Sequence, residues 1–142
     1  MRVERLVPEW ASKCAEIERE CLSTPWTESQ ILDTCSDEHA CYLVALEEEE
    51  PIGILCFYSV CGEASINNLA VTESARRRGA AGELLLFAEQ LARRSGNEKI
   101  TLEVDVSNTG AITLYKKHGY TAVGIRRGFY HGSDAYTMEK RL

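Results

Sequence analysis

The segment between Glu63 and Asp105 constrains the fold more than any other part of the sequence. Its first part, ASINNLAV, has the composition of a β-strand, and RRRGAAG follows with small residues suited to a tight turn. Apolar residues then recur at helical spacing from Ala81 to Ala92, and Gly96 is placed to end that helix. The alternating segment KITLEVD predicts a second strand. Since a helix between two strands lets them run parallel, this unit predicts a mixed sheet covered by a helix.

Further helices are expected on either side of that unit. Pro8 can begin an N-terminal helix whose apolar residues share one face: Trp10, Cys14, Ile17 and Cys21. A second, short helix opens at Thr27, which forms a capping box with Gln30. After KITLEVD, Asn108 can cap another helix, and Gly119 is placed to end it.

The remaining strands complete an α/β (α+β) fold. Four strand-like runs are present: ACYLVAL, IGILCFYSV, YTAVGIR and DAYTMEKRL. The acidic EEEEP segment between the first two is typical of an exposed hairpin turn, so the early strands should be antiparallel. We therefore expect one domain over residues 1–142, with a mixed, mostly antiparallel sheet of six to seven strands flanked by about four helices.

Charge and hydropathy exclude several classes of partner. The net charge of −6 disfavours non-specific binding to nucleic acid, and the short clusters Arg76–Arg78 and Arg126–Arg127 form no basic stripe. No segment reaches the ~18 apolar residues of a membrane span, and MRVERLVPEW contains no apolar run of the signal-peptide type. We expect a cytoplasmic protein without a direct nucleic-acid or membrane partner.

The six cysteines do not follow a zinc-binding pattern. No CxxC pair occurs and the three histidines are scattered, so no metal is expected. Cys14 and Cys21 fall on the apolar helical stripe, and Cys41 and Cys56 lie in strand-like runs, which predicts reduced cysteines acting as small hydrophobic residues. Cys61 stays open as a nucleophile, although nothing in the sequence singles it out.

Arg76–Arg78 stand where a helix would prefer acidic residues. Because a helix N-terminus carries partial positive charge and unpaired N–H groups, each cation there costs about 0.3–1 kcal/mol unless an anion compensates it. Neither the P-loop pattern nor GxGxxG is present. The remaining pattern, R-x-x-G-x-A at Arg76, Gly79 and Ala81, suits a diphosphate held by backbone N–H groups. A solvated basic turn before an ordinary amphipathic helix is the alternative.

This pattern follows a strand that ends in NLAVTE and resembles the acetyl-CoA signature of the GCN5-related N-acetyltransferases (GNAT). NNLAV, RRRGAAGELL, LEVDVSNTGAITLYKKHGY and IRRGFYHGSDAYTM together resemble the bacterial ribosomal-protein-alanine N-acetyltransferases. The match runs from Glu63 to Met138, with Pro25–Trp26 as an outlying piece. The resemblance implies a GNAT fold and acetyl-CoA as cosubstrate. It also implies that the acceptor is the N-terminal α-amino group of a protein, a ribosomal protein that begins with alanine.

The same resemblance implies roles for individual residues. Glu103 matches the general base and Tyr115 the general acid, while Asn68 and Tyr130 are expected to bind substrate. The expected cofactor-binding residues are Leu69, Ala70, Val71, Arg76, Arg77, Arg78, Gly79, Ala80, Ala81, Gly82 and Asn108. Phe129 departs from the family pattern, because relatives often carry a tyrosine there, and Ala81 replaces a more frequent glycine.

Alternatives remain open at the level of the residues. Glu103 also fits an ion-paired strand glutamate, and Tyr115 also fits a core aromatic residue. A lysine, a polyamine or a small-molecule amine is the alternative acceptor. A non-catalytic acyl-CoA-binding module is the alternative from another class of protein, and the retention of both Glu103 and Tyr115 argues against it.

Overall fold

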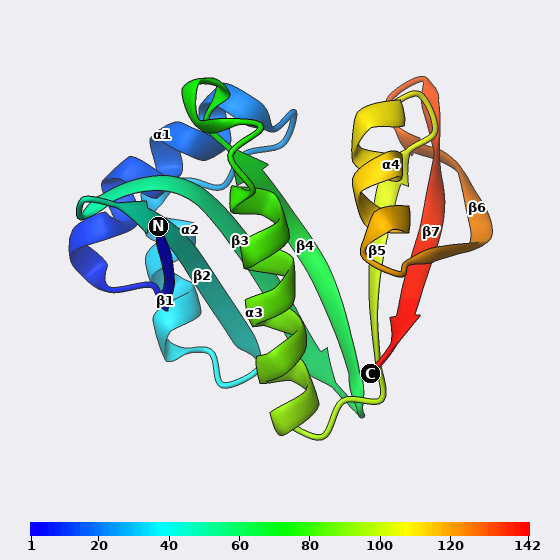
Figure 1. Ribbon diagram of the computed structural model, residues 1–142, viewed down its shortest axis with the longest axis horizontal. Coiled ribbons are helices and arrows are strands. Elements are labelled where there is room, and N and C mark those ends of the chain that lie inside the picture. The colour runs from blue at the N-terminus through cyan, green and yellow to red at the C-terminus, as the bar shows by residue number, and fades with distance from the viewer.

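A seven-stranded sheet runs through the computed structural model, which describes residues 1–142 (Figure 1). The strands are β1 (Arg2–Arg5), β2 (Ala40–Glu47), β3 (Glu50–Val60), β4 (Glu63–Val71), β5 (Lys99–Asp105), β6 (Thr121–Tyr130) and β7 (Ser133–Arg141), in the order β1-β2-β3-β4-β5-β7-β6. Every neighbouring pair is antiparallel except β4 and β5. The predicted sheet, including its parallel crossover, is confirmed.

Four α-helices accompany the sheet: α1 (Ala11–Cys21), α2 (Glu28–Asp33), α3 (Ala80–Arg94) and α4 (Thr109–Lys117). The predicted capping box opens α2, since Thr27 Oγ1 accepts from Gln30 N at 3.2 Å and Gln30 Oε1 accepts from Thr27 N at 2.9 Å. Asn108 Oδ1 caps α4 by accepting a backbone N–H at 3.1 Å. Gly96 and Gly119, both left-handed, follow α3 and α4 as expected.

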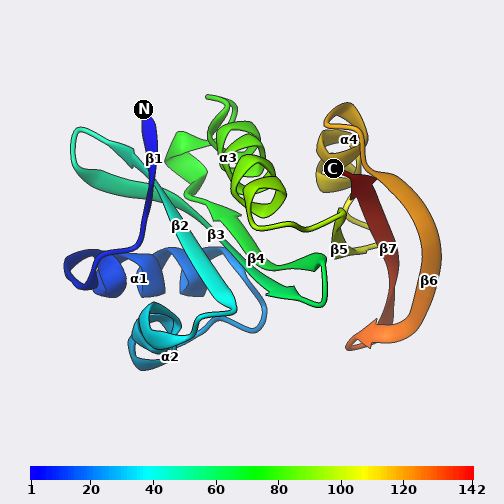
Figure 2. The same ribbon diagram turned by 90° about the horizontal axis from the view of Figure 1, so that it is seen from below.

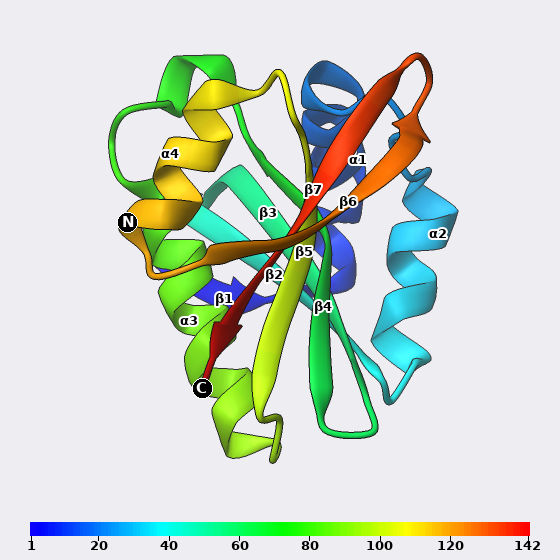
Figure 3. The ribbon, with the colours of Figure 1, turned by 90° about the vertical axis from the view of Figure 1, so that its right-hand side faces the viewer.

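Separate apolar cores cover the two faces of the sheet. Figure 2 shows α1 and α2 against one face and α3 against the other, and Figure 3 shows α4 on the same side as α3. Fully buried side chains on the α1 side include Cys14, Ile17, Ile31, Leu46 and Ile54. Those on the α3 side include Leu43, Leu55, Leu84, Leu85, Ile100 and Met138. Because β2 and β3 are covered on both faces, their sequences are continuous apolar runs rather than alternating ones.

Strand β4 contains a bulge at Asn67. Cys56 of β3 pairs with Asn68, whereas the next residue of β3, Phe57, pairs with Ile66, so Asn67 has no partner in β3. An extra residue reverses the alternation of side chains along a strand. The reversal turns the Asn68 side chain toward α1, where it meets Glu18.

Strands β4 and β5 separate after four paired positions. Their parallel pairing ends at Ile66 and Leu102, while β4 stays paired with β3 to its end and β5 stays paired with β7 as far as Asp105. Figure 1 shows the two strands converging at one end and diverging toward the other. The main chain of Asn67–Val71 is therefore open on the side that faces β5.

One element departs from the prediction. Residues Arg2–Arg5 form β1, an edge strand antiparallel to β2. Four residues with a single apolar side chain, Val3, carry too little alternation to predict a strand. None of the helices combines the length and the apolar character that crossing a membrane requires.

Candidate active site

Two hollows meet where β4 and β5 diverge. The Tyr115 compartment, of about 300 Å³, extends toward α4. The Trp26 compartment, of about 370 Å³, extends toward the α1–α2 loop and the β6–β7 hairpin. Four residues line both of them: Ile66, Asn67, Glu103 and Tyr130. A group that reacts between two bound molecules would sit at this junction.

Glu103 reaches the junction from the middle of β5. Ile100, Leu102 and Val104 are buried, so the carboxylate projects from the opposite face, as the alternation predicts. Its Oε2 accepts a hydrogen bond of 2.6 Å from Thr137 Oγ1 in β7. Its Oε1 lies 3.6 Å from Arg126 Nη1 in β6, and the side chain remains 23% exposed. The carboxylate is thus oriented on one side and open to a ligand on the other.

Tyr115 lies almost fully buried in α4 and lines the Tyr115 compartment together with Glu103. Burial raises the pKa of Tyr115 to about 12, and the neighbouring Tyr130 adds to the shift. The phenol therefore stays protonated throughout the physiological range. The prediction that Tyr115 and Glu103 face one cleft is confirmed, and Tyr115 also packs against Tyr120 with ring centroids 6.0 Å apart.

Six consecutive backbone N–H groups, from Arg77 to Gly82, make no hydrogen bond within the protein. Gly79 is the N-cap of α3 in the left-handed conformation, and no side chain caps the helix. Arg77 is left-handed as well, so the chain turns sharply before the helix begins. A Cβ atom at Gly82 would lie only 3.1 Å from His118 Nε2. The turn thus presents free donors at the positive end of a 15-residue helix, which is the arrangement that binds phosphate.

Two of the three arginines in this turn are engaged by the protein itself. Arg76 Nε donates to Val71 O at 3.1 Å, and its Nη2 lies 3.5 Å from Cys21 Sγ. Arg78 Nη1 pairs with Glu47 Oε1 at 2.6 Å on the surface. All three arginines were expected to screen the charge of a bound diphosphate. Only the Arg77 guanidinium has no partner in the protein, whereas Arg76 and Arg78 hold the turn in place through their own contacts.

The expected substrate-binding residues have different surroundings. Tyr130 lines both compartments and donates a long, 3.4 Å hydrogen bond to Glu103 O. Phe129 packs edge-on against Tyr130 at 5.0 Å and lies below the Arg126 guanidinium at 4.8 Å. Asn68 lines the Trp26 compartment, but its side-chain amide is buried against Glu18. Contact between Asn68 and a substrate would therefore involve its main chain.

Of the expected cofactor residues in β4, Leu69 lines the Tyr115 compartment, as does Asn108 at the start of α4. Ala70 is buried on the α1 side, and Val71 packs against the core on the α3 side. The three β4 residues, Leu69–Val71, present a main-chain edge rather than a set of polar side chains. An extended ligand could pair with this edge as an added strand does.

Two residues that orient the site were not predicted. Thr137 and Arg126 meet Glu103 through the β5–β7–β6 pairing, which no local sequence pattern specifies. Glu18 was missed as well, although it falls between Ile17 and Cys21 on the apolar stripe of α1. A charged residue within such a stripe is the signal that could have identified it.

The cysteines are free thiols, as expected. Cys14, Cys41 and Cys56 are buried in the cores, and burial raises the pKa of each; that of Cys14 rises to about 12. Cys21 is half-buried, and Cys35 and Cys61, for which the sequence predicts no place in the core, are exposed. No group of three or more His, Cys, Asp and Glu side chains is arranged to hold a metal ion.

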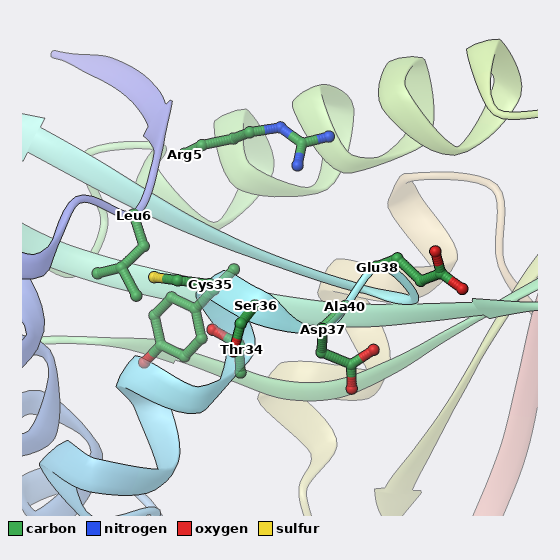
Figure 4. Close-up of a pocket in the computed structure, with 9 residues that line it drawn as sticks. Arg5, Leu6, Thr34, Cys35, Ser36, Asp37, Glu38 and Ala40 are labelled. Carbon is green, nitrogen blue, oxygen red and sulfur yellow. The ribbon is translucent and has the colours of Figure 1, made fainter.

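A third hollow, of about 430 Å³, lies elsewhere on the molecule (Figure 4). Arg5 of β1 stands on one side of it, and the turn that carries Asp37 and Glu38 stands on the other. It contains none of the residues expected to bind cofactor or substrate. The junction at Glu103 therefore remains the candidate active site.

Comparison with known proteins identifies the family. The model of the acetyltransferase (GNAT) family matches residues 9–120. The chain belongs to this family. It is accordingly an acetyltransferase, as the resemblance in the sequence indicates.

Individual relatives agree with the family assignment. A Bacillus subtilis (strain 168) protein provisionally named as a ribosomal protein bS18-alanine N-acetyltransferase is 32% identical over 126 residues, covering 87% of this chain and 83% of that protein. The crystal structure of Ard1 from Thermoplasma volcanium has a TM-score of 0.90 at 26% identity, covering 99% of this chain and 96% of that one. The ribosomal-protein-S18-alanine N-acetyltransferase from Escherichia coli has a TM-score of 0.88 at 24% identity, covering 99% and 92%, and shares the fold.

Proposed function

We propose that this acetyltransferase transfers the acetyl group of acetyl-CoA to the N-terminal α-amino group of a protein, a ribosomal protein that begins with alanine. The names of its relatives support this class of acceptor. The observation that carries the proposal is the position of Glu103 at the junction of two compartments, with Tyr115 on one side and the loop of Trp26 on the other.

The residues present fit the cosubstrate. The six free N–H groups of Arg77–Gly82 match the acceptor oxygens of a diphosphate, and the free Arg77 side chain adds positive charge. The open edge of β4 at Leu69–Val71 matches an extended chain with amide groups. When bound there, acetyl-CoA supplies the activated thioester that is attacked in the reaction.

Glu103 can prepare the acceptor amine. An α-ammonium group has a pKa of about 7.7–8.0, so producing the neutral amine at pH 7 costs roughly 1–1.4 kcal/mol, against about 4.6 kcal/mol for a lysine. A single carboxylate, acting directly or through a water molecule, suffices for the smaller cost. The bond to Thr137 keeps one oxygen of Glu103 fixed while the other faces the junction.

Tyr115 can supply the proton that the departing sulfur needs. A thiolate has a pKa of about 8.5, and the pKa of Tyr115 is about 12, so full transfer is uphill by roughly 5 kcal/mol. The phenol therefore acts by donating a hydrogen bond that strengthens as the carbon–sulfur bond breaks. We assign the stabilisation of the oxyanion to backbone N–H groups on the edge of β4 that its divergence from β5 leaves open.

A peptide assay tests the proposal. The acceptors are a peptide that begins with alanine, the same peptide acetylated at its N-terminus, and a version of the blocked peptide that contains lysine. Mass spectrometry locates the acetyl group. We expect acetylation of the free peptide alone; equal activity on the blocked lysine peptide would show that the acceptor is not an α-amine.

A further inference from the structure

Glu18 of α1 carries a fully buried carboxylate that the proposed reaction does not use. Its Oε1 accepts hydrogen bonds of 2.9 Å from Trp26 N and 2.9 Å from Asn68 Nδ2, and its Oε2 accepts one of 2.5 Å from the Tyr42 hydroxyl. All three partners donate, so the group serves as an acceptor only, which is what an ionised carboxylate provides. Burying a charge is unfavourable unless its hydrogen bonds are satisfied, and here they are.

The two donors on Oε1 come from different elements, and both residues line the Trp26 compartment. Trp26 belongs to the loop between α1 and α2 and lines the compartment together with Thr24. Asn68 belongs to β4 and directly follows the bulge at Asn67, which lines both compartments. One oxygen atom thus joins the loop to the bulged strand.

The loop has no other polar attachment. Residues 23–26 make a single hydrogen bond to the rest of the protein, the one from Trp26 N to Glu18. The Trp26 ring also packs near Tyr42 and Tyr58, with centroid distances of 6.4 Å in both cases. Apolar packing is weakly directional, whereas the hydrogen bond fixes the position of the backbone at Trp26.

We propose that Glu18 is a positioning residue for the acceptor. By holding Trp26 and Asn68 on one oxygen, it fixes the relative position of two residues that line the compartment through which the acceptor amine approaches Glu103. Glu18 acts from behind the wall, because none of its surface is exposed. The inference rests on the proposed function, in which the Trp26 compartment receives the acceptor.

Two conservative variants separate position from charge. Glu18→Gln retains the length of the side chain and an oxygen that can accept from both N–H donors, but loses the charge. Glu18→Asp retains the charge but is shorter by one methylene, so its oxygen cannot hold both donors. If Glu18 instead attracted the ammonium group through its charge, Glu18→Gln would be the more harmful change.

Glu89 provides a matched control. It is a buried carboxylate on α3 that accepts from the Tyr120 hydroxyl at 3.0 Å and from Lys140 Nζ at 2.7 Å, and it lines neither compartment. Glu89→Gln and Glu89→Asp report what the perturbation of a buried carboxylate does to the enzyme in general.

The test is steady-state kinetics with the alanine peptide and acetyl-CoA. For Glu18→Asp we expect the peptide KM to rise about ten-fold or more, with the acetyl-CoA KM within about two-fold of the wild type. Glu18→Gln should keep the peptide KM within about three-fold. A larger rise in Glu18→Gln than in Glu18→Asp, or an equal rise in the Glu89 variants, would overturn the inference.

A second measurement keeps the two proposals apart. If the wild type acetylates no peptide N-terminus, the proposed function fails, and hydrogen–deuterium exchange of the whole protein tests Glu18 without activity. Exchange in residues 22–27 and 66–70 should be faster in Glu18→Asp and close to that of the wild type in Glu18→Gln. Unchanged exchange in Glu18→Asp would rule out the positioning role.

Discussion

Thr137 and Glu103 lie directly opposite each other in the antiparallel pairing of β7 with β5, and Thr137 Oγ1 donates a 2.6 Å hydrogen bond to Glu103 Oε2. Residues opposite each other on one face of a sheet are close enough for such a bond. Arg126 approaches the second carboxylate oxygen from β6. The orientation of the candidate base is thus set by two neighbouring strands rather than by its neighbours in the sequence.

Replacing Thr137 by valine should lower kcat/KM by about 10- to 100-fold, because a hydrogen bond to a charged group contributes roughly 1.5–3 kcal/mol. Thr137→Ser keeps the hydroxyl and should retain most of the activity. Steady-state kinetics on the alanine peptide checks both variants. Turnover of Thr137→Val equal to that of the wild type would mean that the bond does not orient Glu103 for the reaction.

Glu103→Gln should lower kcat by about 10²–10⁴-fold, the span typical of general bases. The affinity for CoA, measured by calorimetry, should stay within about two-fold, because the amide fills the same space. If turnover is preserved, another group or the solvent removes the proton from the amine.

Tyr115→Phe should also lower kcat by about 10²–10⁴-fold, since the ring remains and only the proton donor is lost. Tyr115 is nearly buried, so circular dichroism must show that the variant is folded. If Tyr115→Phe forms CoA at the wild-type rate during turnover, the phenol does not act in the reaction.

The raised pKa of Tyr115 predicts a loss of stability in alkali. The folded-state pKa is about 12 and the unfolded-state value is about 10, so the folded state binds the proton more tightly. The contribution is fully present below pH 10 and is lost as the pH rises from 10 to 12, amounting to about 3 kcal/mol at most. Denaturant unfolding at pH 8 and pH 11 measures it. The decline should be smaller in Tyr115→Phe; an identical decline would refute the assignment.

Gly82→Ala should weaken CoA binding by about five- to ten-fold, because the added Cβ would lie 3.1 Å from His118 Nε2 in the first turn of α3. The double variant Gly82→Ala/His118→Ala should recover the affinity. Gly110→Ala is the control, since a Cβ in the first turn of α4 meets nothing within 4 Å. Calorimetry with CoA measures all three, and an unaffected Gly82→Ala would place the diphosphate away from this turn.

Local sequence signals predicted most of the elements and part of the site. Thr27 with Gln30 marked the start of α2, and the alternation of KITLEVD placed Glu103 on the open face of β5. These features depend on residues close together in the chain. The contact of Thr137 with Glu103 depends on strand register, which is set by long-range packing and is invisible in a single sequence.

The bulge at Asn67 is a second feature of strand register that the sequence does not predict. NNLAV is compatible with a regular strand, and nothing within it specifies which residue loses its partner. The hydrogen-bond partners of Glu18 lie 8, 24 and 50 residues away in the sequence. The sequence therefore shows a charged residue within an apolar helical stripe but does not show which residues it contacts.

The divergence of β4 from β5 has a consequence for how this enzyme can change. Every residue except proline carries the same backbone N–H and C=O groups, so the floor of the junction tolerates other substitutions without losing its donors and acceptors. The surrounding segments, residues 22–26 and 129–132, line the compartments with side chains, so substitutions there change the lining directly. Exchanging those two segments for the corresponding segments of a relative is therefore the most direct route to a new acceptor preference on an unchanged sheet.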